Sequence, residues 1–359
     1  MAYLVFDATY ALKRKQSKSN VYSKFITSQP LAAGSHLYRA MATKPPQKVD
    51  GALGAIGNTP VVRLRKLAPE GSANVWLKLE SLNPTGSYKD RMAKSMIDAA
   101  EEQGRLKPGT TVFDMTGGST GSSLAFVCAI KGYKFKAVTS EVFAAEKLKT
   151  MLAFGSELDI VHSASGGIDA QLFADMSERT AALGTVDDHF WTDQFNNRDC
   201  LPGYAQIGHE LMEQFPEGID AFCGAVGVAG MAMGVSSVLK TQERKCRVVV
   251  LEPASSPVIT RGFSGKHSIE GIGTGSVPPH LNKDLYDDAV AIEECEAREM
   301  CRRLAREEGI LAGTSTGLNV VAALRLAKEL GPGKNVVTVA CDTGLKYLSS
   351  SLFTDSDTI

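Results

Sequence analysis

The stretch that decides the fold is NPTGSYKDR, residues 83–91. It follows an apolar run at 74–80 that predicts a strand, and it leads into a helical pattern from Asp90 to Gly104. Pro, Gly and Ser favour the tight turn between the two elements. Lys89 stands where the helix begins, at the positive end of the helix dipole, where a cation is disfavoured. This placement indicates a special role for its amine.

Strands and helices alternate along the rest of the chain. Further strands are predicted at 111–116, 134–140, 157–163, 220–226, 247–253 and 335–341. Helical patterns lie between them, as at 120–131, 144–154 and 295–308. Apolar strands bounded by helices predict an α/β protein with a parallel sheet covered on both faces. Ligands bind beyond the carboxyl ends of such strands, so the strand-to-helix turns are the candidate sites.

Composition limits the function classes. The 359 residues are 43% hydrophobic and 22% charged, as in a globular protein of two domains or one large α/β unit. The net charge of −1 favours neither a nucleic acid nor a membrane surface as partner. No apolar run reaches the ~18 residues of a membrane span. The seven cysteines are scattered without a C-x-x-C pair, which predicts reduced thiols and no metal site.

Residues 1–48 differ from the rest. They hold eight Lys/Arg and one acid, Asp7. A basic, acid-poor leader fits an organelle transit peptide, and a disordered tail explains it equally well. Met41 is a plausible alternative start that would leave the protein in the cytosol. We expect this segment to lie outside the fold, and a cytoplasmic or mitochondrial location stays open.

The turn at 83–91 suggests covalent chemistry. A lysine held near a positive helix end inside a cleft loses some preference for its charged form. A neutral amine can then bond covalently with an aldehyde. Gly86 and Ser87 would let a flat cofactor approach the backbone. Taken alone, the stretch favours the simpler alternative, a solvated Lys89 paired with Asp90 or Glu101.

Two further turns are rich in small residues. TGGSTGSSLA (116–125) forms a cradle whose N–H groups and hydroxyls suit a carboxylate or phosphate, although a capped helix would look similar. CGAVGVAGMAMG (223–234) leaves backbone open to a phosphate. With Glu252 about 20 residues on, it also resembles a dinucleotide-binding turn, but the spacing is G-x-x-G-x-x-G instead of G-x-G-x-x-G.

A fourth turn, AGTSTGLN (312–319), places Ser315 where a helix begins. A serine hydroxyl that faces a pyridine nitrogen keeps that nitrogen unprotonated. An ordinary N-cap is the alternative role of this serine.

Six stretches, in this order, resemble one family over most of residues 50–350. It is the cysteine synthase/cystathionine β-synthase family, the β-family of pyridoxal-phosphate enzymes with fold type II. NP…S-x-KDR is the most specific match. The stretches are GNTPVVRL (57–64), KLESLNPTGSYKDR (78–91), TGGSTG (116–121), EGIGTGSVP (270–278), AGTSTG (312–317) and CDTGLKYLSS (341–350).

The resemblance implies an architecture and partners. It implies two domains, each a mostly parallel twisted sheet flanked by helices. The larger, cofactor-binding domain is expected at 49–82 plus 200–350, the smaller at 83–199, and a tail at 351–359. The implied cofactor is pyridoxal 5′-phosphate, and the implied assembly is a homodimer.

The resemblance also implies roles for single residues. Lys89 matches the lysine that carries the cofactor and later acts as the base. Ser315 matches the serine facing the pyridine nitrogen, and Gln194 matches a glutamine near the substrate carboxylate. The other matches are a carboxylate loop, Thr116, Gly117, Gly118, Ser119, Thr120 and Gly121, and a phosphate loop, Gly227, Val228, Ala229, Gly230 and Met231.

The chain departs from the family pattern at these loops. The carboxylate loop T-S-G-N-T-G reads TGGSTG here, so Ser119 replaces an asparagine that bonds the cofactor's ring oxygen. The phosphate loop G-T-G-G-T reads GVAGM, so Val228 and Met231 replace threonine hydroxyls. Each lost charge-assisted hydrogen bond costs ~1.5–3 kcal/mol, so cofactor affinity is expected to fall by one or more decades. Cys341 replaces a proline.

The resemblance implies β-replacement on an activated serine, such as O-acetylserine or O-phosphoserine, by sulfide or a thiol, giving cysteine or an analogue. β-Elimination, as in a serine/threonine dehydratase or a cysteine desulfhydrase, is the main alternative, and cystathionine β-synthase activity is another. Outside this chemistry stand a dinucleotide oxidoreductase and a non-catalytic relative that acts as a binding protein. The sequence leaves the leaving group and the nucleophile open.

Overall fold

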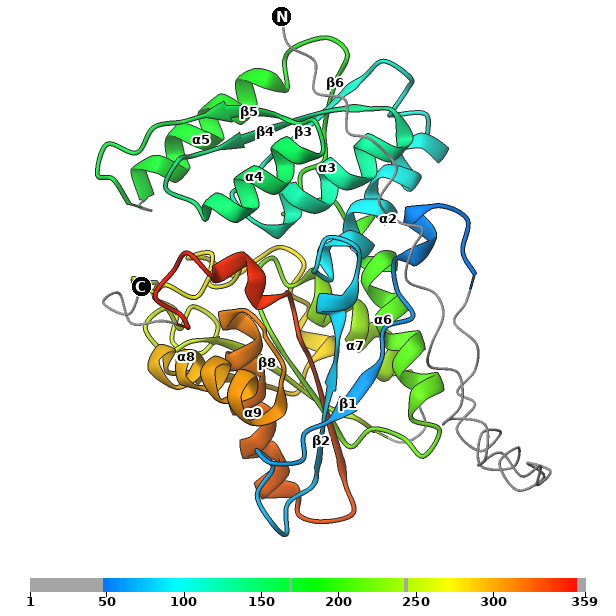
Figure 1. Cartoon of the computed structure of the whole chain (residues 1–359), viewed down its shortest axis with the longest axis vertical. Helices are drawn as coiled ribbons and strands as arrows, with labels where there is room; N and C mark the ends of the chain where they lie inside the picture. Colours follow the sequence, from blue (N-terminus) through cyan, green and yellow to red (C-terminus); the bar gives the residue numbers. More distant parts are fainter. Residues whose placement is uncertain (1–47, 168–169, 242–244, 354–359) are drawn as a thin grey trace, which may run out of the picture. The chain divides into compact units, whose positions relative to one another are not determined.

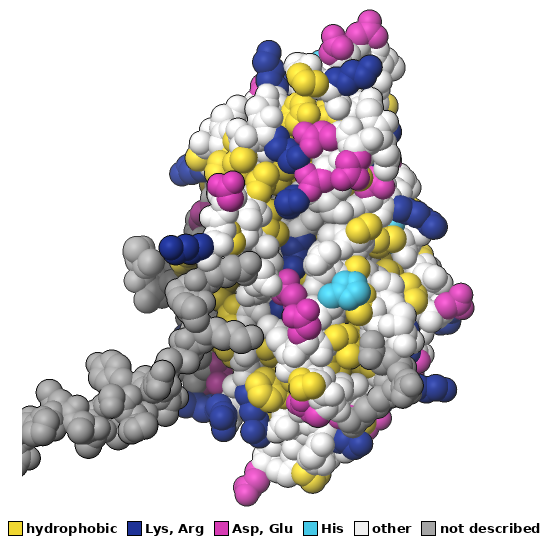
Figure 2. Space-filling model, turned by 90° about the vertical axis from the view of Figure 1, so that its right-hand side faces the viewer, with side chains coloured by type: hydrophobic (Ala, Val, Ile, Leu, Met, Phe, Trp, Pro, Cys, Tyr) yellow, Lys and Arg dark blue, Asp and Glu magenta, His cyan; other side chains and the backbone are white. Residues whose placement is uncertain are grey.

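The computed structural model describes residues 48–167, 170–241 and 245–353, which fold around two β-sheets (Figure 1). The expectations for the leader at 1–47 and for the tail at 354–359 lie outside these residues. None of the described helices is long and apolar enough to cross a membrane. On the face shown in Figure 2, described basic and acidic side chains are interspersed, without a large surface of one sign.

The larger sheet has six strands, in the order β1-β2-β10-β7-β8-β9. All neighbours pair in parallel except β1, which is antiparallel to β2. The predicted α/β class is therefore confirmed. The strands are β1 (Val61–Arg63), β2 (Asn74–Lys78), β7 (Ala221–Ala225), β8 (Arg247–Pro253), β9 (Asp288–Ile292) and β10 (Asn335–Val339).

The smaller sheet has four parallel strands, in the order β5-β4-β3-β6. The strand predicted at 157–163 ends at Ile160, because the chain leaves the sheet there. The short strands β1, β6 and β9 were not predicted. The strands are β3 (Thr111–Met115), β4 (Lys134–Thr139), β5 (Glu157–Ile160) and β6 (His189–Trp191).

Helices cover both faces of the larger sheet. In β8, Val248 and Val250 join the core that contains α6 and α7, whereas Val249 and Leu251 join the core that contains α8 and α9. The two helix pairs accordingly lie on opposite sides of the sheet in Figure 1. This explains the uninterrupted apolar strand. The helices are α6 (Cys200–Gln214), α7 (Gly230–Leu239), α8 (Glu294–Arg303) and α9 (Thr314–Leu330).

Helix α2 (Lys89–Glu102) begins at the turn of the opening motif. Its buried stripe includes Met92, Met96 and Ile97, as the sequence predicts. It packs closely on α6, where Gly203 lies against the backbone of Arg91. The domain boundaries expected near 82 and 199 stay a prediction. The other helices are α3 (Ser119–Lys131), α4 (Ala145–Ala153) and α5 (Ala170–Leu183).

Buried charges fix the start of α2. The guanidinium of Arg91 donates to both Glu80 and Glu210, at 2.7 Å each. Lys78 reaches the same Glu210 at 2.5 Å. Burial alone would raise the pKa of Glu210, but Arg91 and Lys78 outweigh it and lower the pKa to about 2. Strand β2, the turn and α6 are thereby tied to the end of the helix that carries Lys89.

Candidate active site

Lys89 is the first residue of α2, and its side chain is half-buried. Its amine lies 5.4 Å from the ring centroid of Tyr88 and 6.0 Å from that of Tyr204. Burial lowers its pKa from 10.5 to about 8, and the thiols of Cys200 and Cys341 only partly oppose this shift. A sizeable fraction of the amine is therefore neutral near physiological pH.

The simpler alternative for Lys89 is wrong. Asp90 accepts hydrogen bonds from the backbone N–H and the hydroxyl of Thr85. Glu101 pairs with Lys131 instead. Among the described residues, no carboxylate forms an ion pair with the Lys89 amine. The rings of Tyr88 and Tyr204 are its aromatic neighbours.

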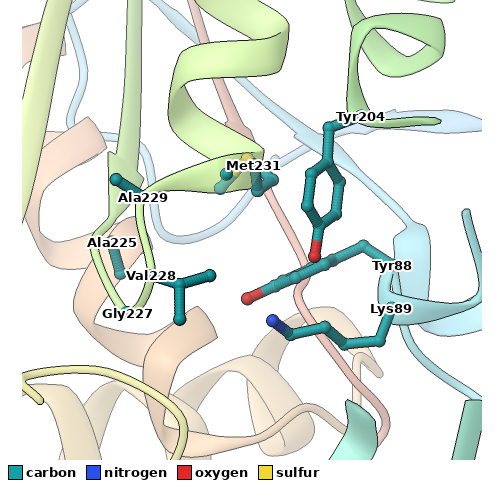
Figure 3. A pocket seen from close by; sticks show the side chains of 9 residues that line it. Tyr88, Lys89, Tyr204, Ala225, Gly227, Val228, Ala229 and Met231 are labelled. Atoms are coloured by element: carbon teal, nitrogen blue, oxygen red, sulfur yellow. The ribbon is translucent and has the colours of Figure 1, made fainter. Parts of the chain in front are cut away.

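Lys89 shares a pocket with the predicted phosphate loop (Figure 3). The loop turns from β7 into α7, which begins at Gly230. Gly227 packs against the carbonyl of Gly271, so a side chain at 227 would collide with backbone. The other lining residues are Tyr88, Tyr204, Ala225, Val228, Ala229 and Met231.

The loop fits a phosphate through its backbone. Within the described chain, the N–H groups of Gly227, Val228 and Ala229 make no backbone hydrogen bond. They stand beside the N-terminus of α7, whose dipole favours an anion. Ala229 has φ 65°, a left-handed conformation that is strained for a residue with a side chain. The backbone thus keeps the cradle, although two hydroxyls of the family pattern are missing.

Apolar groups and a phenol fill part of the pocket. The side chains of Val228 and Tyr88 point into the space beside the Lys89 amine (Figure 3). Burial raises the pKa of Tyr88 well above its usual 10, so its hydroxyl stays protonated. Its ring meets the ring of Tyr204 edge-on, with centroids 5.6 Å apart. This pair forms an aromatic wall beside the amine.

The predicted carboxylate loop turns from β3 into α3. The hydroxyl of Thr116 accepts the N–H groups of Gly118 and Gly121, at 3.3 and 3.1 Å, and so shapes the loop. The hydroxyl of Thr120 donates to Oε1 of Gln194 at 2.7 Å. Gly117 has no room for a side chain because the ring of Phe143 packs on it. The predicted glutamine is therefore held directly against the predicted loop.

Ser119 belongs to a different polar network. Its hydroxyl donates to Oδ2 of Asp342 at 3.2 Å and accepts from Nζ of Lys346 at 3.1 Å. The backbone of Asp342 pairs with Ser87, two residues before Lys89. The network thus connects the carboxylate loop to the turn that carries Lys89.

Ser315 is buried in the first turn of α9. Burial raises the pKa of the neighbouring Cys341 thiol to about 12, and a hydrogen bond with Ser315 partly offsets the shift. The same thiol interacts electrostatically with Lys89. Ser315 is therefore the hydrogen-bond neighbour of a protonated thiol that influences Lys89.

The structure gathers some predicted residues more tightly than others. Lys89 and the phosphate loop line one pocket, whereas the carboxylate loop, Gln194 and Ser315 are not among its lining residues. Sequence reasoning missed Tyr88, Tyr204, Asp342 and Lys346. Three of these lie in the quoted stretches KLESLNPTGSYKDR and CDTGLKYLSS, so the motifs held a signal that was not assigned.

The α/β fold thus places a lysine, at a strand-to-helix turn, in one pocket with a phosphate-binding loop. This arrangement is that of an enzyme whose phosphorylated cofactor bonds to a lysine. Residues 52–342 match the family described as "Pyridoxal-phosphate dependent enzyme". The chain belongs to this family, and its cofactor is pyridoxal phosphate.

Within this family, the chain is similar to cysteine synthases and to a hydrogen sulfide-producing enzyme. The chain is 42% identical over 321 residues to a cysteine synthase of Staphylococcus aureus, a match that covers 88% of this chain and 100% of that protein. It resembles the crystal structure of cysteine synthase from Entamoeba histolytica, with a TM-score of 0.81 and 28% identity over 88% of this chain and 94% of that one. The chain also resembles the crystal structure of a hydrogen sulfide-producing enzyme from Fusobacterium nucleatum. The TM-score is 0.78 and the identity 32%, over 84% of this chain and 100% of that one.

Proposed function

We propose that this protein catalyses β-replacement on an activated serine, with sulfide or a thiol as nucleophile, to give cysteine or an analogue. The single observation that carries the proposal is Lys89, a half-buried lysine whose amine has a pKa of about 8, in one pocket with a phosphate cradle. The similarity to cysteine synthases from two organisms supports the same reaction.

Bound pyridoxal phosphate supplies an aldehyde and an electron-withdrawing ring. The amides of Gly227, Val228 and Ala229 and the first turn of α7 would hold its phosphate. The hydroxyl of Ser315 would donate a hydrogen bond to the unprotonated ring nitrogen.

Lys89 has two tasks in this reaction. Its neutral Nζ would bond the cofactor, and once released it would take the proton from Cα of the substrate. A pKa of about 8 suits both tasks, since a base near the working pH both accepts and returns a proton. The first turn of α3, with Thr120 held by Gln194, would orient the substrate carboxylate.

The test combines attachment and products. Borohydride reduction followed by peptide mass spectrometry is expected to find the cofactor on Lys89. Wild-type protein given O-acetylserine and sulfide is expected to make cysteine, and Lys89→Ala is expected to lose both turnover and the absorbance near ~410 nm of a lysine-linked cofactor. Full activity of Lys89→Ala, or no adduct at residue 89, would overturn the proposal.

β-Elimination is the second candidate, favoured by the similarity to a hydrogen sulfide-producing enzyme. Product analysis with and without added sulfide separates the two reactions. Pyruvate without a thiol product identifies elimination. A protein that stays colourless when cofactor is added would point instead to a non-catalytic binding role.

Two further points belong to this proposal. We propose a homodimer, as the family resemblance implies, and light scattering on the purified protein would measure its mass. The segment 1–48 would decide between cytoplasm and mitochondrion. Fluorescent fusions with and without that segment test this directly.

A further inference from the structure

A tyrosine hydroxyl without a protein partner points into the pocket of Lys89. Tyr88 directly precedes Lys89, and its side chain is 8% exposed. Among the described residues, its Oη makes no hydrogen bond. Figure 3 shows the phenol running from the start of α2 across the pocket, with Oη directed at the phosphate loop beside Val228. A buried hydroxyl without a partner is costly unless a ligand accepts its hydrogen bond.

Packing fixes the direction of this phenol. The N–H of Tyr88 donates to the carbonyl of Cys341 at 3.1 Å, which anchors the backbone. Its ring meets the ring of Tyr204 edge-on, with 5.6 Å between the centroids. Tyr204 in turn lies against Gly230, the first residue of α7, where a β-carbon would stand 2.9 Å from that ring. The two tyrosines therefore connect the start of α2 to the end of the phosphate loop.

The phenol of Tyr88 can act as a hydrogen-bond donor. Burial raises its pKa well above 10, so Oη keeps its proton at physiological pH. A neutral hydroxyl that donates to a phosphate oxygen forms a charge-assisted hydrogen bond, which is stronger than a bond between neutral groups. Of the two tyrosine hydroxyls, that of Tyr204 already donates to Sδ of Met92 at 3.3 Å. Tyr88 thus brings the available donor.

The phosphate loop lacks donors that this hydroxyl can replace. Val228 and Met231 stand where the family pattern has threonine hydroxyls, so the loop offers a phosphate its backbone N–H groups. A phosphate has three strongly accepting oxygens, which leaves acceptor sites for a donor from outside the loop. Tyr88 approaches from across the pocket, where such a donor is needed (Figure 3).

We propose that the Tyr88 hydroxyl donates a hydrogen bond to the phosphate of bound pyridoxal phosphate and takes the role of a threonine hydroxyl that the loop lacks. Tyr88 then contacts the phosphate, while the neighbouring Lys89 bonds the aldehyde of the same cofactor. The inference rests on the phosphate loop of the proposed function, and not on the reaction that the enzyme catalyses.

Two ligands that differ only in the phosphate test this assignment. Pyridoxal 5′-phosphate and pyridoxal are each titrated into cofactor-free protein, and the absorbance of the lysine-linked product reports binding. Tyr88→Phe removes Oη alone and keeps the ring against Tyr204. This variant is expected to bind pyridoxal phosphate about 10- to 100-fold more weakly, the loss of a charge-assisted hydrogen bond, and pyridoxal as the wild type does. Tyr133→Phe is the matched control, because the Tyr133 hydroxyl donates to Glu101 outside the pocket, and it should bind both ligands normally.

The outcomes separate this inference from its premise. Equal weakening of both ligands in Tyr88→Phe would place the hydroxyl at the cofactor ring or at Lys89, and it would overturn the inference. Unchanged affinity for both ligands overturns it as well. If Gly227→Ala then still weakens pyridoxal phosphate, the phosphate loop itself stands. If Gly227→Ala has no effect either, the phosphate loop of the proposed function fails together with the inference.

Inorganic phosphate and protein stability provide two independent measurements. Inorganic phosphate, titrated into cofactor-free protein by calorimetry, is expected to bind more weakly to Tyr88→Phe. The urea midpoint of this cofactor-free variant is expected to equal that of the wild type, because Oη has no hydrogen bond to lose within the described chain. A lower midpoint with normal phosphate affinity would show a structural role and refute the proposal. If no cofactor attaches to Lys89, the phosphate titration still decides the role of Tyr88.

Discussion

Lys89 is expected to destabilise the cofactor-free protein, because its ammonium is partly desolvated and has no carboxylate partner among the described residues. Replacing it with methionine keeps the length and the apolar stem, and it removes the charge. We therefore expect Lys89→Met to abolish cofactor attachment and at the same time to raise the free energy of unfolding of the cofactor-free protein at neutral pH. Lys89 would then be required for the reaction although it lowers the free energy of unfolding.

The magnitude follows from the pKa. The folded-state pKa is about 8, against 10.5 in an exposed lysine. The unfolded chain then binds more protons than the folded one between these values, so wild-type stability rises as the pH rises through this window. At pH 7 the penalty on the wild type is about 3 kcal/mol, and at pH 9.5 it falls to about 1.5 kcal/mol.

Urea unfolding of cofactor-free wild type and Lys89→Met measures the difference at pH 7 and pH 9.5. The advantage of the variant is expected to shrink by roughly 1.5–2 kcal/mol between the two pH values. Lys328→Met, at an exposed lysine, provides the control and should show no such pH dependence. A variant that is less stable than the wild type at pH 7, or a difference that does not change with pH, would refute the burial argument.

Three other changes test the pocket and its support. Val228→Thr returns a hydroxyl to the phosphate loop, and absorbance titration should show cofactor affinity rising about tenfold. Gly227→Ala places a methyl group against the Gly271 carbonyl, so the same titration should show at least tenfold weaker binding. Glu210→Gln removes the carboxylate shared by Lys78 and Arg91 and should lower the free energy of unfolding by about 3–5 kcal/mol in urea. The Glu210 carboxylate stabilises the wild type fully above pH 4.5. This stabilisation is lost as the pH falls toward 2, the folded-state pKa of Glu210.

The sequence predicts most of the fold because burial on both faces leaves a strong pattern. Strand β8 has an uninterrupted apolar run from Val248 to Leu251, and α2 shows its stripe at helical spacing. Strands β1 and β6 have three residues each, too few for a pattern, and neighbouring strands decide their pairing. Strand β9 is longer, but it lies at the edge of the sheet and most of its residues are only half-buried. The end of β5 at Ile160 is likewise set by pairing with β4, which no local propensity encodes.

Some features of the candidate site are visible in the local sequence, and others are revealed only by the fold. Lys89 and the small-residue turns are local features, and their positions follow from strand-to-helix turns. Lys346 approaches Ser119 from a segment more than 200 residues away, so only the fold reveals their contact. The strain at Ala229 is also invisible locally, since φ 65° is imposed by the path from β7 into α7. Tyr88 looks like a surface residue of a turn until the packing of α2 on α6 places it against Tyr204.

The apolar departures in the phosphate loop have two opposite effects on the same pocket. The side chains of Val228 and Met231 donate no hydrogen bond to a phosphate, which weakens cofactor binding. They also add no hydroxyl to those of Tyr88 and Tyr204 in this pocket, and desolvation is the largest cause of the lowered pKa of Lys89. A threonine at 228 would solvate both the phosphate and the ammonium. Val228→Thr should therefore strengthen cofactor binding and at the same time raise the pKa of Lys89. A higher pKa leaves a smaller fraction of the Lys89 amine neutral at a given pH. The pH dependence of cofactor uptake, compared between this variant and wild type, measures the change in the pKa of Lys89. An unchanged pH dependence would show that the two tyrosines alone desolvate Lys89.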